Sequence, residues 1–167
     1  MTDTEMEFAE DTMRGRYITF ALGEETYGIA IRYVTEIVGL QPISKLPEVP
    51  EHIKGIINLR GKIIPVVDMR LKFKKEPAEY TDRTCIVVVE VQGFSAGLIV
   101  DEVSEVATIG DEDISPPPSQ GSGAACRYLG GIGKVSGEVK LLLDCERLFH
   151  EEEAGFLSAA SDKDAIE

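Results

Sequence analysis

The sequence predicts an all-β protein, either a barrel or a sandwich, with few helices. Short apolar runs alternate with turns along most of the chain. Glycine occupies many of these turns, where a tight chain reversal needs a positive φ. Helical patterns are confined to two short stretches, at 68–73 and from Asp144 onward. Together these three observations favour hairpins packed on one another.

The first strands are predicted in the N-terminal third of the chain. Residues 17–22 alternate with the period of a strand, and the turn GEET separates them from a second run, YGIAI. The following run, YVTEIV, is predicted to be a strand with a mixed face. Val34, Glu36 and Val38 point to one side of it, so a charge lies between two apolar side chains.

Three hairpins are predicted further along, where paired runs flank a turn that contains glycine: KGIINL with KIIPVV, TCIVVVEV with AGLIV, and LGGIGKV with VKLLLD. Pro65 lacks an N–H and is expected at a sheet edge or a bulge. Asp68 is the predicted N-cap of the helix at 68–73. The segment 111–126, rich in Pro, Ser and Gly, is expected to be a surface loop.

Composition limits the classes of partner. The 167 residues suit one domain with tails, an acidic disordered one at 1–14 and an acidic, partly helical one at 151–167. Lys and Arg number 17 against 30 Asp and Glu, a net charge of −13 that repels nucleic acid and anionic lipid. Three cysteines without a CxxC motif, no signal-peptide pattern and no long apolar run predict a reduced, cytosolic protein without direct membrane insertion.

No set of residues in the sequence forms a convincing catalytic, metal or cofactor site. His52 and His150 stand outside any metal-binding motif and are interpreted as surface residues. The stretch GGIGK at 130–134 lacks the spacing of a phosphate loop and is interpreted as part of a hairpin, with an anion site as the alternative. Asp101 and Glu102 are adjacent on a strand, point to opposite faces, and are interpreted as solvated charges.

A surface for binding another protein remains the main candidate. Glu36 lies between Val34 and Val38 on one strand face, and Arg60 lies in the predicted turn at 58–61. Apolar groups beside a charge on an accessible strand make a plausible docking patch. The residue pattern by itself leaves open the alternative that Glu36 and Arg60 are unrelated solvated charges.

Several stretches, taken in order, resemble the CheW family of bacterial chemotaxis coupling proteins. They are YITFALGEETYGIAIRYVTEIV, ISKLPEVPEHIKGIINLRGKIIPVVDMRLKF, GLIVDEVSEV, ISPPP and YLGGIGKV with VKLLLDCERLF. The resemblance implies a domain at 15–150 made of two SH3-like, five-stranded β-barrel lobes packed together, followed by a short C-terminal helix. It also implies a non-catalytic adaptor that links the cytoplasmic tips of chemoreceptors to the regulatory domain of the histidine kinase CheA. A similar adaptor of another receptor–kinase pathway is the alternative.

The resemblance also assigns candidate site residues. It implies an ion pair between Glu36 and Arg60 near the receptor surface. The receptor-facing positions that it implies are Val34, Glu36, Gly55, Asn58, Arg60, Cys85 and Val106. The candidate positions for the kinase contact are Ile43, Lys45 and Leu46.

Overall fold

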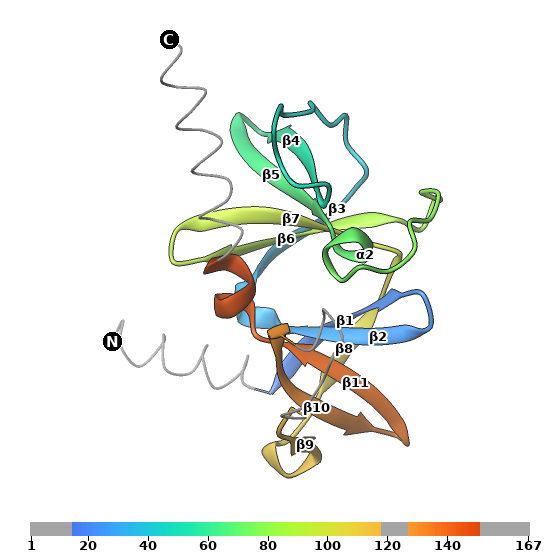
Figure 1. Ribbon diagram of the computed structural model, residues 1–167. Helices are drawn as coiled ribbons and strands as arrows, with labels where there is room; N and C mark the ends of the chain where they lie inside the picture. The colour runs from blue at the N-terminus through green and yellow to red at the C-terminus, as the bar shows by residue number, and fades with distance from the viewer. Residues whose placement is uncertain (1–14, 118–126, 151–167) are drawn as a thin grey trace, which may run out of the picture.

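The computed structural model describes residues 15–117 and 127–150. The tails predicted at 1–14 and 151–167, and most of the loop predicted at 111–126, lie outside the described residues. Two β-sheets form two lobes packed on each other (Figure 1). This arrangement confirms the all-β prediction.

The upper lobe in Figure 1 contains a five-stranded sheet, and the lower lobe contains a six-stranded sheet. The first has the order β3-β6-β7-β5-β4, with β3 (Val34–Gly39), β4 (Ile53–Leu59), β5 (Lys62–Asp68), β6 (Cys85–Val91) and β7 (Phe94–Val100). The second has the order β8-β1-β2-β11-β10-β9, with β1 (Arg16–Leu22), β2 (Glu25–Ala30), β8 (Glu102–Thr108), β9 (Ile114–Ser115), β10 (Leu129–Val135) and β11 (Glu138–Leu143). The short β9 is a strand beyond the five expected in this lobe.

Short helical segments lie between these strands and after the last of them. They include η1 (Ile31–Tyr33), α2 (Met69–Lys72), η2 (Asp111–Asp113) and, after β11, a helix at 145–150. The predicted loop at 111–126 therefore begins with a helical turn and with β9. In Figure 1, α2 and the helix at 145–150 lie on opposite sides of the junction between the lobes.

The two lobes repeat one plan. The order β8-β1-β2-β11-β10 matches β3-β6-β7-β5-β4, and in both sheets one pair is parallel, β11 with β2 and β5 with β7. The sequence VTEIVG of β3 corresponds to VSEVAT in β8, which places Glu105 where the first lobe has Glu36. Each of these strands has a register shift just before that glutamate. The chain crosses from one lobe to the other twice, from β2 to β3 and from β7 to β8.

The largest hydrophobic core lies between the sheets. Along β6, Val87, Val89 and Val91 enter this shared core, while Ile86 and Val88 enter a smaller core inside their own lobe. Both faces of β6 are thus buried, which explains its nearly continuous apolar sequence. Each fully buried aliphatic side chain contributes roughly 1.5–3 kcal/mol. We therefore expect the lobes to fold as one cooperative unit.

Pro65 lies in β5, which is interior in the strand order, but at a residue where β5 is not yet paired with β7 and next to a register shift in β4. Its partner Ile56 exchanges both backbone hydrogen bonds with Ser44, at 2.9 and 2.8 Å, and so directs them away from β5. Pairing of β5 with β7 begins one residue later, at Val66. No hydrogen bond of the sheet therefore requires an N–H at this position, which proline lacks.

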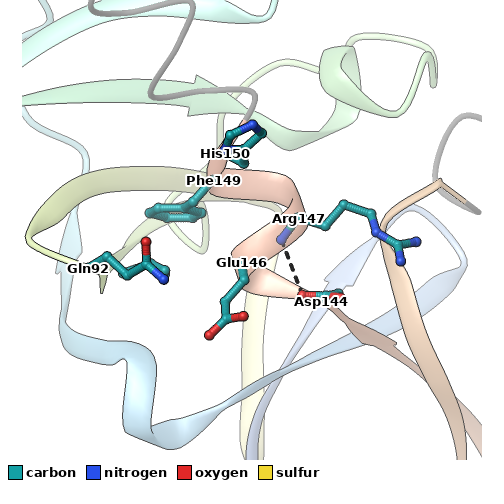
Figure 2. Close-up of a pocket in the computed structure, with 7 residues that line it drawn as sticks. Gln92, Asp144, Glu146, Arg147, Phe149 and His150 are labelled. Atoms are coloured by element: carbon teal, nitrogen blue, oxygen red, sulfur yellow. Dashed lines mark hydrogen bonds between the residues drawn. The ribbon is translucent and has the colours of Figure 1, made fainter.

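Both predicted helix starts are confirmed. The side chain of Asp68 accepts hydrogen bonds from the backbone N–H groups of Arg70 and Leu71, at 3.0 and 3.3 Å. Asp144 accepts from the N–H of Arg147 at 3.2 Å (Figure 2). A side-chain acceptor at an N-cap satisfies N–H groups that have no partner inside the helix.

Candidate functional site

The five-stranded sheet curls enough to bring side chains from its two edge strands into contact. β3 and β4 stand at opposite ends of the strand order, yet Arg60, in the β4–β5 turn, forms an ion pair with Glu36 of β3. Under this pair, Ile57 of β4 and Val38 of β3 contribute to the same small core. The ion pair implied by the resemblance is therefore present, although the two residues are far apart in the sheet order.

The β4–β5 turn has two central residues, Arg60 and Gly61, with φ of 53° and 86°. Positive φ at both positions defines a type I′ turn. Asn58 and Leu59 still belong to β4, which corrects the expectation of a turn at 58–61. The side chain of Asn58 accepts a hydrogen bond from the N–H of Gly61 at 2.8 Å and so supports the turn.

The Glu36–Arg60 pair is too exposed to be explained by stability. The side chain of Arg60 is 73% exposed and that of Glu36 is 26% exposed. Exposed ion pairs contribute roughly 0–1 kcal/mol. In addition, the left-handed conformation is unfavourable for arginine. A residue kept at a strained, accessible position suits recognition of a partner.

A hollow of about 310 Å³ lies beside the pair. Glu36 and Arg60 line it together with Lys62, whose Nζ donates to the Oγ of Ser95 at 3.0 Å. Lysine and arginine are both present, and Glu90 also borders the hollow. Its surface therefore offers positively charged hydrogen-bond donors and negatively charged acceptors to another protein.

Gly55 has a packing role under the segment that carries the candidate kinase contacts. It is buried with φ of 147°, and a Cβ at this position would lie 2.1 Å from the backbone oxygen of Ser44. Only glycine lets this segment cross β4 so closely. Within the segment, Ile43 and Leu46 are half-buried and Lys45 is exposed. Ile43 also packs against the small core of the lobe.

The other predicted receptor-facing residues lie further apart. Val34 is half-buried and packs against the shared core. Cys85 is half-buried at the start of β6, and burial raises the pKa of its thiol, partly offset by a hydrogen bond with the backbone of Val103. Val106 is 50% exposed on β8, at the edge of the other sheet. The structure thus brings Glu36, Asn58 and Arg60 together and places Val106 on the second lobe.

The structure also locates the stretch GGIGK and the two histidines. Residues 130–134 lie within β10, which pairs with β11 on one side and β9 on the other, so their prediction as part of a hairpin is confirmed. His150 is exposed and His52 is half-buried. The described residues contain no group of three or more His, Cys, Asp or Glu side chains able to hold a metal ion. Nor do they contain a helix long and apolar enough to cross a membrane.

Sequence reasoning missed the role of Asp101, which is not a solvated strand-end charge. Arg70 donates to it twice, from Nε to Oδ1 at 2.7 Å and from Nη2 to Oδ2 at 2.5 Å. These bonds, with a further one from the N–H of Gly23, hold the pKa of Asp101 below its ordinary value. Strand alternation identifies the face of a residue and not its partner, so it gave no signal of this contact.

Comparisons with known proteins agree with this architecture. A family model described as CheW-like domain matches residues 16–153. The chemotaxis protein CheW of Klebsiella aerogenes is 35% identical over 150 residues, which cover 90% of each chain. The probable chemotaxis protein CheW of Rhizobium etli is 34% identical over 137 residues, covering 82% of this chain and 88% of the relative.

A solved structure shows the same similarity. The scaffolding protein TtCheW from Thermoanaerobacter tengcongensis superposes with a TM-score of 0.73 and 40% sequence identity, covering 77% of this chain and 88% of that chain. At this identity the likeness extends beyond the general fold. Together with the family model, it shows that the chain belongs to the CheW family.

Proposed function

We propose that this chain is a non-catalytic chemotaxis adaptor that couples the cytoplasmic tip of a chemoreceptor to the histidine kinase CheA. The observation that carries the proposal is membership of the CheW family over nearly the whole described chain. In this role the chain binds receptors and kinase and is recruited to the inner face of the membrane by the receptors. It supports receptor-controlled kinase activity without performing a reaction itself.

The receptor contact is assigned to the surface around Glu36 and Arg60. A guanidinium has five N–H donors in a planar fork, and Glu36 engages one of its nitrogen atoms. Among the described residues, no other group bonds to this guanidinium, so its remaining donors can bind a carboxylate or carbonyl group of a partner. Leu59 of β4 lines the same hollow, is half-buried, and supplies apolar area next to the charged pair. Such a mixture is typical of protein interfaces.

The kinase contact is assigned to the segment that crosses β4. Ile43, Lys45 and Leu46 lie on this segment. Two backbone hydrogen bonds between Ser44 and Ile56 connect the segment to β4. The proposed partner surface is the regulatory domain of CheA. This assignment rests on the family resemblance and on the accessibility of Lys45.

A sedimentation experiment tests the proposal. Receptor-containing membranes are mixed with CheA, with and without this chain, and the CheA in the pellet is measured. We expect the chain to increase the sedimented CheA, and Arg60→Glu to abolish the increase. Arg83→Glu is the matched control, because Arg83 is also 73% exposed and its pair with Glu102 is long, at 3.8 Å. Sedimentation of CheA that does not depend on the chain would contradict the proposal.

A further inference from the structure

Three ion pairs cross the junction between the lobes in the same sense. In each pair the cation belongs to the connection from β5 to β6 in the five-stranded lobe, and the anion belongs to β2, to β8 or to the residue just before β8. We call this set the ionic seam; its pairs are Arg70–Asp101, Lys75–Glu25 and Arg83–Glu102. Two of these pairs, Arg70–Asp101 and Arg83–Glu102, line an open hollow of about 320 Å³.

Asp101 is anchored to the six-stranded sheet by its own backbone and side chain. It occupies the crossover from β7 to β8. Its N–H donates to the carbonyl oxygen of Ala21 at 3.1 Å, and its Oδ2 accepts from the N–H of Gly23 at 2.8 Å. β8 begins at the next residue, Glu102. Any displacement of Asp101 therefore moves the start of β8.

Arg70 is anchored to the other lobe with equal firmness. It lies on α2, whose first turn is capped by Asp68, and its Nη1 donates to the carbonyl oxygen of Glu76 at 3.0 Å. Asp68 in turn accepts from the hydroxyl group of Tyr80 at 2.8 Å. Because Arg70 and Asp101 are each held in place before they meet, their two parallel hydrogen bonds are directional and lose little side-chain entropy.

The crossover from β2 to β3 has a corresponding but looser contact. Arg32 donates to the hydroxyl group of Tyr33 at 3.0 Å, and that hydroxyl group donates to Glu146 at 3.5 Å. Glu146 lies on the helix at 145–150, beside the pocket in Figure 2. Arg32 occupies the crossover position of Asp101, and Glu146 the helix position of Arg70, with the charges exchanged. Both crossovers are thus tied to a helix, and the tie at Arg70 is direct and bidentate.

We propose that the Arg70–Asp101 pair fixes the orientation of the two lobes and thereby keeps Val106 on β8 aligned with Glu36 and Arg60 as one docking surface. The shared apolar core holds the lobes together, but apolar attraction has no direction. The bidentate pair supplies the direction. Arg70 and Asp101 are positioning residues that do not touch the partner. The statement about docking rests on the proposed function, whereas the statement about orientation does not.

Residual dipolar couplings of the full chain test the orientation. In the wild-type protein the couplings of both sheets fit one alignment tensor with the lobes placed as in the structure. In Arg70→Gln each sheet should still fit by itself, while the wild-type orientation fails to fit both. Arg83→Gln is the matched control, because it removes the same charge from the same seam. The side chains of Arg83 and Glu102 are 73% and 49% exposed. Arg70→Lys, which keeps the charge but not the fork, should lie between them.

Receptor binding tests the second half of the proposal. We expect Arg70→Gln to weaken binding of a receptor fragment roughly tenfold, a size common for coupling between separate sites, and Arg83→Gln to leave it unchanged. Asp101→Asn should repeat the effect of Arg70→Gln if that variant does not fold. Wild-type orientation in both disrupted variants would overturn the proposal, as would wild-type affinity despite altered couplings. A wild-type chain that binds no receptor would instead contradict the proposed function and leave the orientation result standing.

Discussion

Replacing Arg60 by asparagine separates partner binding from folding. Arg60 holds the first central position of a type I′ turn, with φ of 53°, and Gly61 follows it. Asn-Gly is the preferred pair for this turn, because asparagine tolerates the left-handed conformation. The substitution therefore removes the guanidinium group while it improves the match between residue and backbone.

The expected change in stability is small because two terms oppose each other. Loss of the pair with Glu36 costs roughly 0–1 kcal/mol, since the side chain of Arg60 is 73% exposed. In the opposite direction, the left-handed conformation costs asparagine less than the roughly 1–2 kcal/mol that it costs most residues. The free energy of unfolding should then change by less than about 1 kcal/mol, which corresponds to no more than about 4 °C in the midpoint of thermal unfolding.

The assay combines thermal unfolding, followed by circular dichroism, with binding of a receptor fragment. Arg83→Asn is the control, because it removes an equally exposed guanidinium group from another surface. We expect the melting midpoint of Arg60→Asn to stay close to that of the wild type. The affinity for the receptor fragment should fall more than about tenfold, because the variant loses one charge-assisted contact. A midpoint lowered by more than about 10 °C would show that Arg60 is structural. Undiminished binding would remove the Glu36–Arg60 surface from the interface.

Three further predictions concern packing, pH and thiol chemistry. Gly55→Ala should lower the unfolding free energy by about 2–4 kcal/mol in urea titrations, because its Cβ would meet the backbone of Ser44 at 2.1 Å; Gly39→Ala, with no atom within 4 Å, should change it little. The pKa of Asp101 lies below its ordinary value of 3.8 in the folded protein. Its stabilisation is therefore complete above about pH 4 and is lost as the pH falls through the lowered pKa. The difference in unfolding free energy between wild type and Asp101→Asn should shrink in acid, and a difference that grows there would refute this account. Burial raises the pKa of Cys145 to about 12, so its thiol should resist iodoacetamide at pH 8 until the protein is denatured, as mass spectrometry of the labelled peptides would show.

The hairpins were predictable because their turns have a local chemical cause. Gly61, Gly93 and Gly137 each follow a first turn residue with positive φ and adopt positive φ themselves. The caps at Asp68 and Asp144 are local in the same way. The missing N–H of Pro65 predicted an unpaired position, but it gave no signal that its partner Ile56 bonds to the distant Ser44. Features set within a few residues could thus be inferred, and those set by distant segments could not.

The repeat of the two lobes was present in the sequence but hidden by conservative exchanges. VTEIVG and VSEVAT share little more than the position of the glutamate, and both satisfy the same alternation. Substitutions that preserve volume and patterning are well tolerated in β-structure, so a repeat can persist without clear identity. The strand order and register made the correspondence of Glu36 and Glu105 visible.

The candidate site was predictable only in part. Alternation identified Glu36 as a charge among apolar residues, and a glycine marked the turn next to Arg60. The residue pattern left these two charges unpaired, and the resemblance to the CheW family paired them. Curling of the sheet, which brings them into contact, depends on register across five strands. The same holds for the contact of Arg70 with Asp101.

The most direct test of the adaptor function is the kinase activity of CheA in reconstituted receptor membranes. Autophosphorylation is measured without this chain, with the wild-type chain, with Arg60→Asn and with Arg83→Asn. The proposed function predicts that the wild type and Arg83→Asn activate the kinase and make it sensitive to receptor ligand, while folded Arg60→Asn does neither. A kinase rate that is the same with and without the wild-type chain would contradict the function proposed for this protein.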